Sequence, residues 1–161
     1  MSIAVPSNFD AENADNLEDI EKQFAVMAVT QAQTYWNLLC SLKGSTLRLT
    51  KLDDDIYNHL ITDFPEYSTA ASVKKINESD MKNHKGKERW RKFMNTYEKT
   101  VNDYNFGSLL RTDSDAEYEQ DTTIFVPRIQ FLAIEIARNK HGLNDWVYEN
   151  EQRLNAEAAK K

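Results

Sequence analysis

The run of residues from Ile124 to Asn139 restricts the possible folds of this chain most strongly, because it is densely apolar and yet contains charges. The charged residues in the run are Arg128, Glu135 and Arg138. Each charge near the centre of a membrane-spanning helix costs about 2.5–3.5 kcal/mol, so the run does not suit a membrane span. Proline is favoured in the first helical turn and glycine just after the last. We therefore predict a helix that begins at Pro127, ends at Gly142 and lies at the centre of one compact domain.

The length and charge of the chain limit its partners. A chain of 161 residues fits one domain, which we expect to be a monomer. Its 20 basic and 26 acidic residues give a net charge of −6, which disfavours nucleic acid as a partner and favours a basic protein or simple solubility. The first ten residues lack the basic and apolar regions of a signal peptide, so we expect a cytosolic protein with access to the nucleus.

The apolar pattern predicts a mainly α-helical single domain over residues 15–154, between a disordered arm at residues 1–14 and a flexible tail at residues 155–161. A first long helix should start at a capping box formed by Asp15 and Glu18 and stop at Gly44. Apolar residues occur on more than one side of it, so we expect neighbours on both sides.

Three further helices and a small ribbon are expected after this helix. A second helix should run from Thr50 to Asp63, followed by a loop over residues 66–77 and a short turn through Met81. The apolar spacing after Gly86 predicts a helix that continues to Tyr104. Residues 106–111 and 122–126 can pair as a two-stranded ribbon lying against helices. Asn144 is expected to cap the last helix.

The residues that usually carry chemistry are scattered. The four glycines are far apart, so the chain has no glycine-rich nucleotide loop of the dinucleotide, P-loop or AdoMet type. Its three histidines fall in separate segments, and consecutive carboxylates at residues 53–55 point in different directions on a helix. Cys40, the single cysteine, is expected to be an inert core thiol. We predict no catalytic, cofactor-binding or metal-binding residues.

Arginines and aromatic residues near the central helix are candidates for binding a partner. Both kinds of side chain often anchor protein interfaces. The candidates are Phe106, Arg111, Phe125 and Arg128. The competing explanation is structural: Arg128 and Arg138 can form ion pairs with Glu135, and Phe125 can belong to the core.

Four blocks of this sequence resemble a known family. They are residues 24–36, 49–54, 101–111 and 124–139. Together they are similar to the polysaccharide biosynthesis domain-containing protein 1 family, small cytosolic proteins of fungi and animals, over roughly residues 17–145. Nothing in the blocks resembles a sugar-nucleotide site.

The resemblance implies a function without catalysis. Members of this family act as dedicated chaperones that bind the GTP-binding domain of translation elongation factor 1-alpha during its synthesis. We therefore expect this chain to bind that factor and to use no cofactor. The alternative, suggested by the family's title, is an enzyme of polysaccharide biosynthesis.

Overall fold

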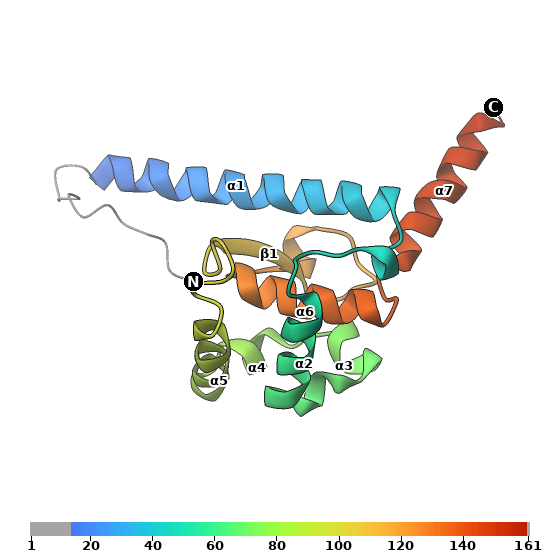
Figure 1. Ribbon diagram of the computed structural model, residues 1–161. Coiled ribbons are helices and arrows are strands. Elements are labelled where there is room, and N and C mark those ends of the chain that lie inside the picture. Colours follow the sequence, from blue (N-terminus) through green and yellow to red (C-terminus); the bar gives the residue numbers. More distant parts are fainter. Residues whose placement is uncertain (1–13, 161) are drawn as a thin grey trace.

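Helix α6 (Arg128–Lys140) runs through the middle of the molecule (Figure 1). The computed structural model describes the backbone of residues 14–160 and the side chains of residues 22–160. Every residue from Ile129 to Asn139 is buried. An α-helix that is apolar around most of its circumference can be stable only when neighbours cover every side. The predicted central helix is therefore confirmed.

Both ends of α6 are hydrogen-bonded outside the helix. At the start, where Pro127 has no N–H, the N–H of Arg128 donates to the Phe106 carbonyl and that of Ile129 to the Tyr104 carbonyl, each at 2.7 Å. At the end, Gly142 has a φ of 71°, and the next N–H, of residue 143, reaches back to the Arg138 carbonyl at 2.9 Å. This Schellman pattern satisfies carbonyls that a helix end would leave unpaired.

The other described elements lie around α6, most of them in two layers. They are α1 (Ala14–Ser41), α2 (Asp53–Asp63), α3 (Ala70–Lys74), α4 (Glu78–Lys82), α5 (His84–Asn95), β1 (Gly107–Arg111), β2 (Thr123–Pro127) and α7 (Asp145–Ala159), with short 3-10 turns at Gly44–Thr46, Pro65–Ser68 and Gln120–Thr122. Helix α1 and the β1–β2 ribbon lie on one side of α6, and α2 to α5 lie on the other (Figure 1). The chain is thus a mainly helical single domain with one small sheet in its described part.

The predicted ribbon is present. Strands β1 and β2 pair antiparallel, with Gly107 opposite Pro127 and Arg111 opposite Thr123. A two-stranded ribbon is marginally stable alone, and here it packs between α1 and α6. Leu110 and Val126 are buried, so the inward residues of the ribbon join the core.

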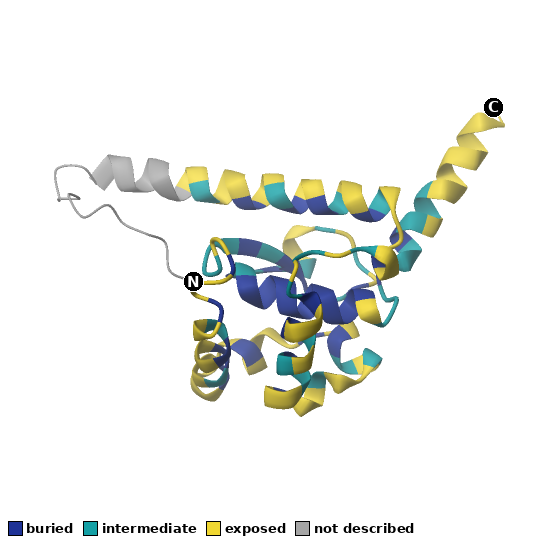
Figure 2. Ribbon diagram, in the orientation of Figure 1, coloured by how far each residue is buried: buried dark blue, intermediate teal, exposed yellow. Residues whose placement is uncertain are grey.

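The long first helix is confirmed, but the expectation that it is covered on both sides is wrong. Only one face of α1 is buried, through residues such as Ala28, Tyr35 and Leu39 (Figure 2). Its apolar residues on the other sides are exposed, because the described part of the chain places no element over them. With 28 residues, α1 is about 42 Å long and extends beyond the layer it covers (Figure 1).

Two expectations for the middle of the chain need correction. The predicted loop over residues 66–77 contains α3, which is capped by Thr69 and held by buried Val73. Helix α5 ends at Asn95, not at Tyr104, although Tyr97 and Val101 remain buried in the turns that follow. Within these turns Asp103 has a φ of 56°, which is incompatible with a right-handed helix.

The C-terminal prediction is also revised. Helix α7 continues to Ala159 through most of the segment predicted as a tail, with every residue from Gln152 to Lys160 exposed. Asn144 occupies the position before α7, but its side chain makes no capping hydrogen bond. The predicted arm covers residues 1–14, of which residues 1–13 lie outside the described residues, whereas Ala14 already belongs to α1. The side chains of the predicted capping box, Asp15 and Glu18, lie outside the described side chains. No helix of the described chain is long and apolar enough to cross a membrane.

Candidate partner-binding surface

A charged cluster is enclosed in the interior beneath α1. Arg111 of β1 and Arg138 of α6 both approach the Oε1 atom of Glu135, at 3.1 Å and 3.7 Å. All three side chains are 0 % exposed. The cluster therefore pins the ribbon to the central helix from inside.

Two asparagines extend the cluster to neighbouring elements. Asn144 accepts a hydrogen bond from Arg111 at 2.6 Å and donates to Glu135 at 3.3 Å and to Asn139 at 2.7 Å. Asn139 donates in turn to the Tyr35 hydroxyl of α1 at 3.3 Å. The side chain of Asn144 is used here, which explains why it does not cap α7.

Two arginines against one carboxylate leave an excess positive charge in this cluster. Main-chain carbonyls compensate: Arg111 donates to those of Ser114 and Ala116, and Arg138 donates to that of Val73 at 2.7 Å. Burial alone would lower the pKa of Arg111, but the nearby Glu135 raises it above the usual value. For Arg138 burial prevails and lowers the pKa. Both guanidinium groups nevertheless remain charged, because arginine does not lose its proton in proteins.

Aromatic rings separate the cluster from the surface. The Arg111 guanidinium carbon lies 5.4 Å from the Trp36 ring centre and 5.6 Å from that of Tyr118. Trp146 contacts Trp36 edge-to-face, and its indole N–H donates to the Ser114 carbonyl at 2.7 Å. The charged interior thus stabilises the position of the half-buried Trp36 and Tyr118 rings.

Trp36 and Tyr118 also line an open groove of about 610 Å³ between α1 and the segment that precedes β2. We call it the α1 groove. The other lining residues are Val29, Ala32, Gln33, Leu109, Glu117, Glu119, Gln120 and Thr123. Two carboxylates and no basic residue belong to this set, so the groove combines an apolar floor with acidic sides. Trp36 is half-buried in this groove, and only its three-dimensional neighbours reveal this role.

Part of the exposed surface of α1 continues the apolar character of the groove. Its exposed large apolar residues, each between 37 % and 63 % accessible, are Val26, Met27, Val29, Leu38 and Leu42. Val26 and Val29 are three residues apart and lie on the same side of the helix as Trp36. Exposed apolar patches beside a groove commonly mark protein-interaction sites.

The structure shows that the hypothesis for Arg111 is wrong, since this residue is enclosed and cannot reach a partner at the surface. The competing explanation is half right: Glu135 does form internal ion pairs, but with Arg111 and Arg138. Arg128 makes no side-chain hydrogen bond or ion pair within the described chain and remains half-buried. Sequence spacing put Arg128 near Glu135, whereas strand pairing brings Arg111 there instead.

The two candidate phenylalanines do not lie at one site. Phe106 is half-buried against the ring of Phe24 in α1, with ring centres 5.0 Å apart. Phe125 is half-buried on β2 and lines a different groove, next to α5. Binding of a partner by Phe106, Phe125 or Arg128 therefore stays a prediction.

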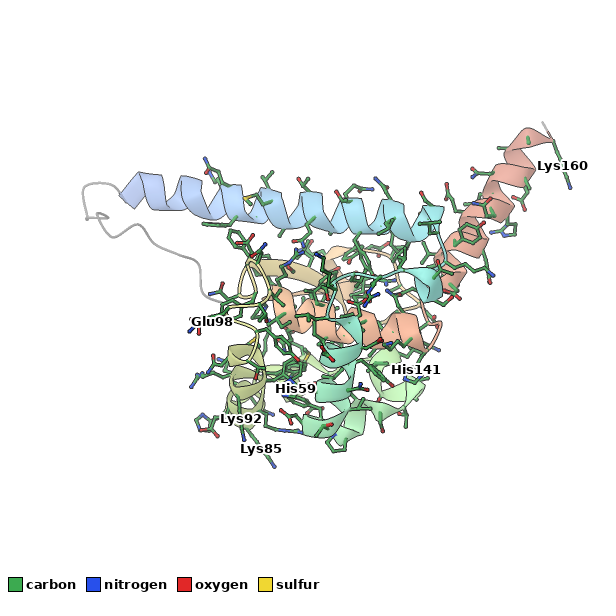
Figure 3. The ribbon with its side chains drawn as sticks, in the orientation of Figure 1. His59, Lys85, Lys92, Glu98, His141 and Lys160 are labelled. Atoms are coloured by element: carbon green, nitrogen blue, oxygen red, sulfur yellow. The ribbon has the colours of Figure 1, made fainter. Side chains whose placement is uncertain are left out.

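The reactive residue types do not gather in the described chain. No group of three or more histidine, cysteine, aspartate or glutamate side chains is arranged there to hold a metal ion. Burial raises the pKa of the Cys40 thiol, as expected, although this residue is partly exposed. His59, labelled in Figure 3, lies between α2 and α5 with its two ring nitrogens 2.8 Å from the Tyr97 hydroxyl and an Asp63 oxygen. The Asp63 contact lies within α2, and the Tyr97 contact joins α2 to the turns after α5. The His59 ring also stacks on Phe93 of α5, with ring centres 4.4 Å apart.

Comparison with known proteins gives consistent matches across most of the chain. A family model described as PBDC1 protein matches residues 20–149. A Saccharomyces cerevisiae protein named Protein PBDC1 homolog is 64 % identical over 141 residues, which cover 88 % of this chain and 97 % of that protein. Protein PBDC1 of Mus musculus is 41 % identical over 147 residues, covering 91 % and 72 %. Neither name is that of an enzyme.

A solved structure supports the same relation. The solution NMR structure of a Saccharomyces cerevisiae protein matches with a TM-score of 0.79 and 62 % sequence identity. The match covers 89 % of this chain and 99 % of the other. The fold described above is therefore similar to one determined experimentally for a relative.

Proposed function

The chain belongs to the PBDC1 protein family, and from this premise we propose that it is a dedicated, non-catalytic chaperone for newly made translation elongation factor 1-alpha, acting in the cytosol. The client contact would be made with the GTP-binding domain of that factor. This function is the one implied by the resemblance of residues 24–36, 49–54, 101–111 and 124–139 to the family.

The observation that best supports the proposal is the α1 groove together with the exposed apolar residues beside it. A chaperone must cover apolar client surface, and Val26, Val29 and Trp36 provide apolar area on a rigid helix. The buried cluster around Glu135 holds the floor of the groove in place. A preorganised surface loses less conformational entropy when it binds.

The charge of the groove suits a basic client. Glu117 and Glu119 lie along the side of the groove, and the whole chain has a net charge of −6. Opposite charges on a client would speed encounter and orient the complex. An acidic surface of this kind also discourages contact with the phosphates of ribosomal RNA during translation.

The alternative, an enzyme of polysaccharide biosynthesis, has less support. Its sugar-nucleotide substrate would need a phosphate-binding turn, and the four glycines of the chain are far apart. The discriminating measurement is a thermal-shift titration with UDP-sugars or AdoMet. A saturable stabilisation of several degrees would favour the enzyme.

The test of the chaperone proposal is capture of elongation factor 1-alpha as it is made in a cell-free translation extract. The wild-type chain should retain the newly made factor, whereas a Val26→Asp, Val29→Asp variant should retain at least about tenfold less, equivalent to about 1.4 kcal/mol. Both valines are exposed, so the variant should melt like the wild type.

The matched control is a Thr34→Asp, Ser41→Asp variant. It adds the same charge to exposed positions on another stripe of α1, away from the α1 groove, and should capture normally. Failure of the wild-type chain to capture the factor would reject the proposed function. Equal capture by all three proteins would support the proposed function but would show that the α1 groove is not the site that binds the client.

A further inference from the structure

A second groove, of about 690 Å³, lies between α5, the turns after it, β2 and the start of α6. We call it the α5–β2 groove. Its lining residues are Met81, Lys82, Lys87, Trp90, Arg91, Met94, Asn95, Tyr104, Asn105, Phe125, Pro127 and Gln130. None of them belongs to α1, so the α5–β2 groove is separate from the α1 groove.

The floor of this groove is apolar and adaptable. Phe125 and Tyr104 are half-buried, and Met94 beside them is likewise only partly covered by the fold. Methionine is flexible and polarizable, and it accommodates apolar groups of different shapes. The floor can therefore accept aliphatic or aromatic side chains of a ligand.

The rim of the groove is basic. Its charged residues are Lys82, Lys87 and Arg91, and no aspartate or glutamate lines it. Lys82 is hydrogen-bonded to Glu78 at 2.8 Å, whereas Lys87 and Arg91 form no ion pair within the described chain. Lys87 and Arg91 are four residues apart on α5, so they lie on the same face of the helix. On a chain whose net charge is −6, this rim is complementary to an acidic ligand.

Gln130 offers hydrogen-bonding groups to a ligand in the groove. It lines the groove at only 5 % exposure, and its side-chain amide makes no hydrogen bond within the described chain. Its amide atoms are not among the buried side-chain atoms that lack a partner, so they are accessible from the groove. They can donate to and accept from the peptide groups of a ligand.

The main chain around the groove argues against a phosphate ligand. Phosphates often bind the free N–H groups at the start of a helix. Here the N–H groups of Arg128 and Ile129 at the start of α6 are already used by the carbonyls of Phe106 and Tyr104. The attraction for anions therefore comes from the long side chains of Lys87 and Arg91 on α5. Two separate cations of this kind suit two spaced carboxylates better than one compact phosphate.

We propose that the α5–β2 groove binds a segment of a partner polypeptide in which acidic side chains alternate with apolar ones. The apolar side chains lie on Phe125 and Met94, the carboxylates pair with Lys87 and Arg91, and a main-chain peptide group bonds to Gln130. This site goes beyond the chaperone function proposed above. The α1 groove suits a basic client, whereas the α5–β2 groove, at a different place on the molecule, recognises an acidic segment.

The test is fluorescence anisotropy of a labelled synthetic peptide of alternating leucine and aspartate, titrated with the full chain. A Lys87→Glu, Arg91→Glu variant should bind it at least about tenfold more weakly and should instead bind the leucine–lysine counterpart. The control variant is Lys92→Glu, Lys99→Glu. It changes the net charge by the same amount at exposed positions outside the groove. Lys92 is labelled on α5 in Figure 3. The control should bind like the wild type.

Several results would overturn the proposal. Equal binding of the leucine–aspartate peptide by all three proteins, or no binding by the wild type, would exclude the basic rim as a peptide site. Competition by UDP-glucose or inorganic phosphate would assign the groove to a small anion. Tighter peptide binding by a full-length Asp10→Lys, Glu12→Lys variant would show that the chain's own N-terminal segment occupies the groove. If the chain sediments as a dimer and the peptide dissociates this dimer, the occupant is a second copy of the chain.

Discussion

At the scale of single residues, Glu135 links β1, α6 and the segment before α7 through buried contacts. It is the carboxylate shared by Arg111 and Arg138, and its side chain is fully buried. A buried ion pair adds little net stability compared with a well-packed apolar core, but removing one partner leaves an uncompensated charge in the interior. Here the loss would leave two buried arginines facing each other.

We predict that Glu135→Gln, which keeps the shape of the side chain and removes its charge, lowers the free energy of unfolding by about 3–5 kcal/mol. Urea unfolding followed by circular dichroism measures the change. The exposed Glu149→Gln serves as the control and should stay within about 0.5 kcal/mol of the wild type. A Glu135→Gln protein as stable as the control would mean that main-chain carbonyls alone satisfy the two arginines.

At the scale of elements, the packing of α4 against α5 depends on Gly86. This glycine is inside the first turn of α5, where its N–H donates to the capping Asn83 side chain at 2.7 Å. A Cβ atom added at this position would lie 2.1 Å from the main-chain carbonyl oxygen of Asp80. The two helices therefore come closer than any side chain at this position would allow.

Gly86→Ala is expected to destabilise the protein, although the same change in an exposed helix stabilises by about 1 kcal/mol. The clash is with backbone, which cannot move without separating α4 from α5. Thermal unfolding of this variant should be compared with that of Lys87→Ala, its exposed neighbour. An unchanged or raised melting temperature for Gly86→Ala would contradict the close packing of α4 and α5.

At the scale of the whole molecule, the layers around α6 enclose several tyrosine hydroxyls. Burial raises the pKa of Tyr67 to about 12 and that of Tyr97 to about 12. Burial also raises the pKa values of Tyr35 and Tyr118 well above the usual value of 10.0. These four residues belong to α1, to the segments after α2 and α5, and to the segment before β2. Their ionisation therefore reports on the packing of the complete fold.

The free energy of unfolding should fall as the pH rises from about 10 towards about 12. In this window the unfolded chain loses phenolic protons while the folded chain keeps them, so the unfolded state binds fewer protons and becomes favoured. Below the usual tyrosine pKa the contribution to stability is complete. Urea unfolding across the window measures the fall, and Tyr67→Phe should make it shallower. A flat profile for the wild type would show that these hydroxyls ionise freely in the folded chain.

The sequence by itself determined the elements whose signals are local. The apolar density of residues 124–139, with Pro127 at the helix start and Gly142 after the helix, sufficed for α6, because helix ends depend on near neighbours. The β-branched residues of the segment 122–126 indicated the second strand of the ribbon. The four family blocks likewise identified the family, which the comparisons confirmed.

Only the tertiary structure decided which charged and apolar residues are accessible. Arg91 and Arg111 each follow an apolar residue in the sequence. Strand pairing nevertheless encloses Arg111 beside Glu135, whereas Arg91 lies on the rim of the α5–β2 groove. The apolar pattern of α1 could not show that one side lacks a neighbour. Burial depends on contacts between segments far apart in the chain, and residue spacing within one segment contains no record of them.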